Sequence, residues 1–244
     1  MRNIKLTIEY DGSGYAGWQR QPSGPTIQET LETSLMTITG ENIKLLGSGR
    51  TDSGVHALGQ VANFRTGTSL SAGELQKGLN SLLPKDIVIT DAEDAEPGFH
   101  AQLSAKSKTY IYKILSRPFP SALLRERAWF VPYPLKARLM DEAARTLVGE
   151  HDFRAFAQSG ATVRSTVRTV LSAGVRKRKD ILEFRIEADG FMKRMVRLMV
   201  GTLVQVGKER ISPGEFRGIL ESGEKTKFVH AAPARGLYLK EVKY

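Results

Sequence analysis

Residues 47–64 read GSGRTDSGVHALGQVANF, and a single carboxylate, Asp52, stands in the middle of this glycine-rich stretch. The apolar runs on either side predict two strands, at 43–48 and 60–66, joined by the Asp52 loop. Because the flanking glycines accept backbone conformations that other residues resist, the loop can bend sharply and expose Asp52. An aspartate between glycines is also an ordinary turn former, so spacing alone does not separate a turn from a reactive carboxylate.

Neither common phosphate-binding loop fits this stretch. The P-loop spacing from Gly49 is met at Gly54, but Val55 and His56 then stand where Lys and Ser or Thr are needed. The dinucleotide-binding pattern fails as well, because Asp52 occupies its third glycine position. The sequence therefore predicts no nucleotide cofactor.

The composition is basic and free of cysteine. The 244 residues carry 36 Lys and Arg against 26 Asp and Glu, a net charge of +10. This balance favours a nucleic-acid partner, whose phosphates bind Lys and Arg with release of counterions. No apolar run approaches the length of a membrane helix, and no amphipathic anchor is evident, so a membrane partner is not expected. Without cysteine, and with four histidines that lack metal-ligand spacing, no metal site is predicted. These features fit a cytoplasmic protein.

The first half of the chain alternates strand and helix signals in the order β-α-β-β-α-β, the ferredoxin-like motif. The helix expected at 71–82 opens with a capping box, Ser71 followed three residues later by Glu74. The expected elements are strands at 4–10, 43–48, 60–66 and 86–93, and helices at 26–39 and 71–82.

The second half gives nearly the same order, although no sequence repeat links the halves. We expect strands at 104–115, 167–176, 181–188 and 237–244, and helices at 135–147, 191–206 and 213–221. The fold class predicted is α+β. It consists of two ferredoxin-like or RRM-like units, domains 1–103 and 104–244, with mixed, largely antiparallel sheets flanked by helices. Two such units would leave a cleft where their sheets meet, and sites often lie at such interfaces.

Long motifs in one order resemble the tRNA pseudouridine synthase A (TruA) family. The segment GRTDSGVHALGQVANF is similar to the active-site stretch of that family. Further resemblances lie in YDGSGYAGWQRQ (10–21), FHAQLSAKSKTYIYKI (99–114), GEHDFRAF (149–156), DGFMKRMVRLMVGTL (189–203) and GLYL (236–239).

The resemblance implies an enzyme, an isomerase that converts uridine to pseudouridine at positions 38, 39 and 40 in the anticodon stem-loop of tRNAs. It implies a homodimer, no cofactor, and a basic cleft that takes the RNA. It assigns the catalytic carboxylate to Asp52, the ring that packs on the flipped base to Tyr110, and the basic partner of the carboxylate to Arg197. Arg50 matches an arginine that helps to draw the base out. Whether Asp52 attacks C1′, adds to the uracil ring or acts on a sugar proton stays open.

The residues themselves give partial support to these roles. By the period-two rule, Lys106, Lys108, Tyr110 and Tyr112 share one side of their strand, which indicates a solvated, RNA-facing surface rather than a core tyrosine. On a helical projection, Lys193, Arg194 and Arg197 lie opposite an apolar stripe (Met192, Val196, Met199 and Leu203); an ordinary solvated face is the alternative. An Arg–Asp pair would keep Asp52 ionised and orient it.

Other features favour plainer interpretations. Trp18 is expected in the core, and the RKRK run at 176–179 at a solvated hairpin tip. Gln102 and Leu103 depart from the family pattern, which commonly has Arg and Phe there, so RNA contacts at this point are in doubt.

Two other functions fit parts of the sequence. A noncatalytic RNA-binding module would explain the charge, although the RNP1 pattern is absent and Asp52 would have no role. A glycosidase would need a second acid near Asp52, and the nearest on the C-terminal side, Glu74, lies on an expected helix.

Overall fold

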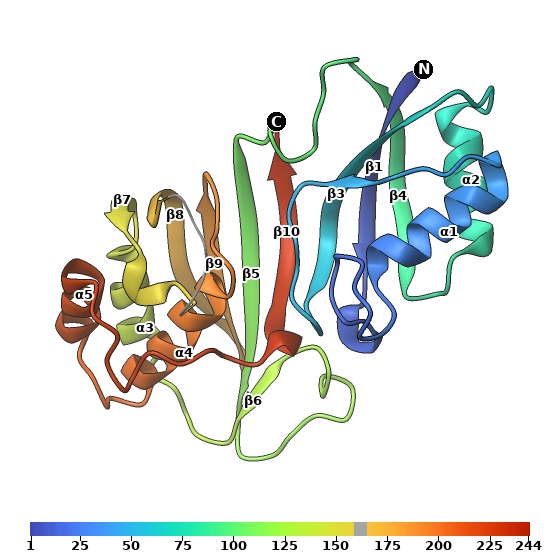
Figure 1. Ribbon diagram of the computed structural model, residues 1–244. Helices are drawn as coiled ribbons and strands as arrows, with labels where there is room; N and C mark the ends of the chain where they lie inside the picture. The colour runs from blue at the N-terminus through green and yellow to red at the C-terminus, as the bar shows by residue number, and fades with distance from the viewer. Residues whose placement is uncertain (159–164) are drawn as a thin grey trace. The chain divides into compact units, whose positions relative to one another are not determined.

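The computed structural model describes residues 1–158 and 165–244. The chain divides into two compact units (Figure 1), each of which is described by itself: unit 1 is Met1–Lys106 with Leu239–Tyr244, and unit 2 is Ser107–Tyr238. The sequence placed the boundary at 103/104 and kept the last strand in the second domain. The C-terminal residues instead return to unit 1, where the carbonyl of Lys243 accepts a hydrogen bond from the backbone N–H of Lys106.

Unit 1 has the predicted β-α-β-β-α-β order, and its strands pair antiparallel in the order β4-β1-β3-β2. Alternate residues of β1, Ile4 to Tyr10, are buried on one face of this sheet, and α1 and α2 lie together on one side of it in Figure 1. The elements are β1 (Arg2–Tyr10), α1 (Ile27–Thr39), β2 (Leu46–Gly47), β3 (His56–Thr66), α2 (Ala72–Leu82) and β4 (Ile87–Ala95).

Local signals set the helix ends of unit 1. The Thr26 side chain accepts from the backbone N–H of Glu29 at the start of α1, and Gly40 ends that helix in the left-handed conformation, with φ of 70°. The capping box of Ser71 and Glu74 is present at the start of α2. These contacts satisfy backbone groups that a helix leaves unpaired at its ends.

The sheet strands of unit 2 follow the order β5-β9-β8-β7, and β6 pairs with β5. The pairs are antiparallel except β5–β6, which is parallel. Helix α4 is buried along almost its whole length and packs against α3. The elements are β5 (Ser107–Ser116), β6 (Trp129–Val131), α3 (Ala137–Arg145), β7 (Gly149–Asp152), β8 (Val167–Arg178), β9 (Ile181–Ala188), α4 (Met195–Gly207), α5 (Pro213–Ser222) and β10 (Leu237–Lys243), which continues into unit 1.

The α+β class and the mixed, mostly antiparallel pairing are confirmed, and three local predictions differ from the structure. The strand expected at 43–48 is only two residues long in the structure, where it is β2. The strands β6 and β7 were not predicted, because they are too short to show an alternating pattern. Helix α4 begins at Met195, four residues after the expected start, because Arg194 adopts a left-handed conformation with φ of 60°. Within the described ranges, no helix has the length and apolar character needed to cross a membrane.

Candidate active site

The Asp52 loop of unit 1 is a tight turn held by its own backbone. The N–H of Val55 donates to the carbonyl of Asp52 at 3.1 Å, which closes a four-residue turn. Gly54 supplies the positive φ, 76°, at the third position, where a residue without Cβ is favoured. The Asp52 residue is half-buried, and its neighbours Thr51 and Val55 are buried. The turn thus presents one partly exposed carboxylate on a fixed backbone.

A first support for the turn comes from the segment that follows β1. Gly17 forms a backbone bridge with Asp52, and the N–H of Trp18 donates to the carbonyl of Thr51 at 3.1 Å. Gly17 has φ of 112°, and a Cβ there would lie 2.7 Å from the Thr51 carbonyl oxygen. Only glycine allows this approach, so the sequence GW at 17–18 fixes the position of Asp52.

Buried hydrogen bonds support the loop from the sheet. The Tyr10 hydroxyl and the Thr51 Oγ1 lie 2.8 Å apart, and burial raises the pKa of Tyr10, so this hydroxyl stays protonated. The Gln60 amide accepts from the Ser48 hydroxyl at 2.6 Å and donates to the Gly49 carbonyl at 2.9 Å. Such satisfied buried networks rigidify the segment that they join.

A third support joins the far end of the turn to Gly12. The N–H of Gly12 donates to His56 Nδ1 at 3.2 Å, and His56 is 2% exposed. A Cβ on Gly12 would lie 2.0 Å from the Val55 carbonyl oxygen, so the two backbones are in close contact. The supporting roles of Gly12, Gly17 and His56 were not predicted from the sequence. The glycine spacing of GSGYAGW (12–18) was a signal for the two glycines.

We expect Gly17→Ala to displace the Asp52 turn. The added Cβ meets backbone and the φ is unfavourable, so unfolding free energy should fall by about 2–4 kcal/mol and kcat by roughly 10- to 100-fold. Gly14→Ala is the matched control, since a Cβ there would have nothing within 4 Å. Thermal unfolding and single-turnover rates measure both effects; equal behaviour of the two variants would contradict the support assigned to Gly17.

Arg50 lies two residues before Asp52 and is exposed. The carbonyl of the preceding residue, Gly49, is held by Gln60, so the chain is anchored on either side of Arg50 by Gly49 and Thr51. The position of this side chain at the rim of the turn allows contact with a base or a phosphate.

Tyr110 lies in β5 of unit 2, opposite Ile186 of β9, and is 8% exposed. Its ring packs edge-on against Phe191, with centroids 5.0 Å apart and planes at 81°. Tyr112 is fully buried, Lys108 is half-buried, and burial lowers the pKa of Lys108. The solvated face that the period-two pattern predicted is therefore wrong for Tyr110 and Tyr112, which tertiary packing covers, whereas Lys106 is exposed.

Arg197 lies in unit 2 at the third position of α4 and is the one residue of that helix that is not buried. Its Nε donates to the Ala232 carbonyl at 2.8 Å, and its own carbonyl accepts from the Ala232 N–H at 2.9 Å. The Tyr112 hydroxyl donates to the next carbonyl, that of Pro233, at 2.7 Å. Residues 232–233 therefore connect Arg197 of α4 with Tyr112 of β5 through hydrogen bonds to two successive backbone carbonyls.

The basic helical face expected for Lys193, Arg194 and Arg197 is not formed. The first two residues precede α4, and the helix itself is buried on all sides apart from Arg197. A Cβ at Gly201, one turn after Arg197, would lie 1.8 Å from the carbonyl oxygen of His230, so the segment from 230 to 232 crosses the helix there at close range. This packing explains why the helix has no solvated stripe.

The predictions for Trp18 and for the RKRK run are confirmed. Trp18 is 2% exposed and packs over Gly47, and the RKRK run reaches an exposed hairpin tip at Lys179. Gln102 and Leu103 are exposed, and their N–H groups donate to His100 Nδ1 at 3.1 and 3.3 Å. In the part of the chain that the structure describes, no group of three or more His, Asp or Glu side chains could hold a metal ion.

A model of the family described as tRNA pseudouridine synthase matches residues 6–102 and 143–244. The chain belongs to this family. The tRNA pseudouridine synthase A of Thermoanaerobacter sp. (strain X514) is 47% identical to this chain over 244 residues, which are 100% of both chains. The proteins of the same name from Geotalea uraniireducens (strain Rf4) and Acetivibrio thermocellus (strain ATCC 27405) are 46% and 45% identical, again over 100% of both chains. The matched residues include Asp52 and Arg197 but end before Tyr110 in the first segment.

Proposed function

We propose that this synthase isomerises uridine to pseudouridine at positions 38, 39 and 40 in the anticodon stem-loop of tRNAs. Family membership over the whole chain supports the isomerase activity and tRNA as the substrate, and the resemblance of the motifs supports the anticodon stem-loop. The observation that carries the proposal is the Asp52 turn, in which one carboxylate is held on a backbone braced at Gly12, Gly17 and Thr51.

The reaction breaks the bond between C1′ of the ribose and N1 of uracil and forms a bond between C1′ and C5. N1 gains a proton and C5 loses one, so atoms balance without an oxidant or a donated group. Asp52 acts as the nucleophile, which divides the exchange into two steps through a covalent intermediate. The fixed turn keeps the carboxylate oriented through both steps.

The target base must leave its stack before the carboxylate can reach it, at a cost of a few kcal/mol. Tyr110 offsets part of this cost by packing against the flipped base, a contact worth about 1–3 kcal/mol. Its ring is already braced by Phe191 at a centroid distance of 5.0 Å, so it loses little freedom when the base binds. Arg197 pairs with the Asp52 carboxylate during the reaction, and Arg50 helps to draw the target base out of its stack.

Incubation with unmodified tRNA transcripts tests this function. Each transcript carries uridine at 38, 39 or 40, and pseudouridine is mapped by carbodiimide labelling and primer extension. We expect product at those positions and none in transcripts in which they are replaced by cytidine. Product elsewhere in the tRNA, with none in the anticodon arm, would keep the enzyme class and overturn the site specificity.

Homodimerisation and a cytoplasmic location are also proposed, on the strength of the resemblance. Light scattering after size-exclusion chromatography should give twice the mass of one chain. A monomer that is fully active would contradict the dimer.

A further inference from the structure

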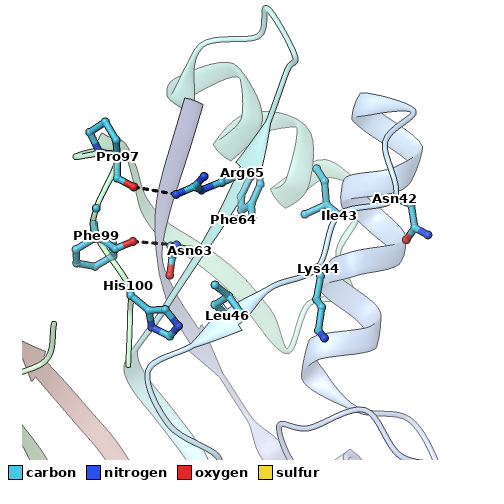
Figure 2. Close-up of a pocket in the computed structure, with 11 residues that line it drawn as sticks. Asn42, Ile43, Lys44, Leu46, Asn63, Phe64, Arg65, Pro97, Phe99 and His100 are labelled. Carbon is cyan, nitrogen blue, oxygen red and sulfur yellow. Dashed lines mark hydrogen bonds between the residues drawn. The ribbon is translucent and has the colours of Figure 1, made fainter. Parts of the chain in front are cut away.

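Unit 1 holds a pocket of about 420 Å³ apart from the Asp52 turn. It crosses the end of β3, with the segment 42–46 along one side and the segment 97–100 along the other (Figure 2). The pocket exists because β2 pairs with β3 only at Leu46 and Gly47, so the chain before Leu46 diverges from Phe64 and Arg65. Its volume falls in the range of small-ligand sites, large enough for a nucleotide.

The ionisable side chains of this pocket are all hydrogen-bond donors or can act as such. Lys44 and Arg65 are exposed cations, and Arg65 uses one Nη2 bond, at 3.2 Å, to the Pro97 carbonyl. His100 accepts backbone N–H groups at Nδ1, which leaves its proton on Nε2 in the neutral ring, and Figure 2 shows the ring directed toward Leu46. Among the described residues, the eleven that line the pocket include no Asp or Glu.

Acids near the pocket are mostly engaged elsewhere. The Glu41 carboxylate accepts from the Thr66 hydroxyl at 2.9 Å and from the Gly67 N–H at 3.0 Å. Asp94 is paired with Arg2 and Glu93 with Lys5, at 2.8 and 2.7 Å. These contacts leave Lys44 and Arg65 without a carboxylate counterion among the described residues, so their charge is available to an anion.

The remaining lining residues make the pocket a stable receptor. Asn63 donates to the Asn3 side chain and to the Phe99 carbonyl, and it accepts from the Ala101 N–H at 2.8 Å. This buried network fixes the segment 97–101 against β3, so the wall of the pocket that carries His100 and the Pro97 carbonyl is held in place before a ligand arrives. Leu46, 38% exposed, adds an apolar floor. The cations of the pocket suit the phosphates of a nucleic-acid strand, and Leu46 can contact the apolar part of a nucleotide.

We propose that this pocket binds a nucleotide of the tRNA strand outside the reacting uridine, with its phosphate held by Lys44 and Arg65. The inference rests on the proposed function, which makes tRNA the substrate. Such a contact carries no base readout; it sets the register of the RNA on unit 1. It would therefore act on affinity for tRNA and leave the chemical step of bound substrate unchanged.

The test compares Lys44→Gln/Arg65→Gln with the control Lys77→Gln/Lys85→Gln, which removes two exposed cations of the same unit outside the pocket. Filter binding of an unmodified tRNA is measured from 50 to 300 mM KCl. We expect Kd to rise roughly tenfold at 100 mM KCl and the slope of log Kd against log salt to fall by about 2, one for each lost contact. The control should stay within about twofold, and single-turnover rates at saturating tRNA should match wild type.

Three outcomes would overturn the proposal. One is an unchanged Kd and salt slope in the pocket variant, and another is an equal change in the control. The third comes from calorimetric titration with UMP: binding that depends on Lys44 and Arg65, with tRNA affinity unchanged, would assign the pocket to a free nucleotide. Because Kd reports binding and not product formation, failure of the anticodon specificity or of the Asp52 mechanism leaves this test intact. A wild-type protein that binds no tRNA would contradict both proposals. Circular dichroism confirms that each variant is folded.

Discussion

Asp52→Asn should reduce pseudouridine formation by on the order of 10⁴-fold or more, the scale on which an active-site nucleophile is lost. The amide is nearly the same size as the carboxylate, and the turn depends on the backbone carbonyl of residue 52, which accepts from Val55. The variant therefore keeps its fold and its affinity for tRNA but has no nucleophile. Release of tritium from tRNA labelled at C5 of uridine, in single turnover, measures the loss.

The matched control is Asp91→Asn, an exposed acid of β4 in the same unit. It should retain wild-type rates. Full activity of Asp52→Asn would remove the catalytic role, and an RNA-binding module would show no activity in wild type either. Free uracil released by the wild-type protein would indicate a glycosidase instead, since an isomerase retains the base.

The architecture of unit 1 was largely predictable because its signals are local. Alternation along β1, the Thr26 cap and the capping box at Ser71 each involve residues within a few positions of one another. The short strand β2 was overestimated because an apolar run indicates burial, and Ile43 and Leu45 are buried without pairing to β3. Burial and strand pairing coincide often enough to make the two hard to separate by sequence.

The environment of the candidate site residues could not be predicted from the sequence. Asp52, Tyr110 and Arg197 came from motif resemblance, and their roles remain proposals. What the sequence could not show was the burial of Tyr110 beside Phe191, or of α4 on all sides, because both depend on segments far along the chain. The segment 230–233 crosses α4 and accepts a hydrogen bond from the Tyr112 hydroxyl, but its sequence has no periodic pattern that would predict this position.

Arg197→Met should lower kcat by about 10²- to 10³-fold, the range found when one preorganised donor is removed from an active site. Arg197→Lys should recover little of this loss. The guanidinium donates through Nε to Ala232 and can present both Nη groups to a carboxylate in one rigid fork, whereas a lysine offers a single ammonium. The KM for tRNA should change much less than kcat, because the proposed partner of Arg197 is Asp52 rather than the RNA backbone.

Arg194→Met is the control for this series. Arg194 is exposed, carries the same charge and lies three residues earlier, outside α4. Its loss should leave kcat within about twofold. If both variants reduce kcat equally, Arg197 acts only through overall charge; if neither does, the pairing with Asp52 is wrong.

The surroundings of Arg197 allow a packing role to be separated from a catalytic one. Every other residue of α4 is buried. An apolar side chain at position 197 would therefore pack between α4 and the segment 230–232 without the cost of desolvating a cation. The bond from Nε to the Ala232 carbonyl is worth about 1–3 kcal/mol, which offsets part of that cost. Arg197→Met should therefore lose kcat while its unfolding free energy stays within about 1 kcal/mol of wild type. A large fall in stability, with kcat lost only in proportion to the folded fraction, would make Arg197 a packing residue.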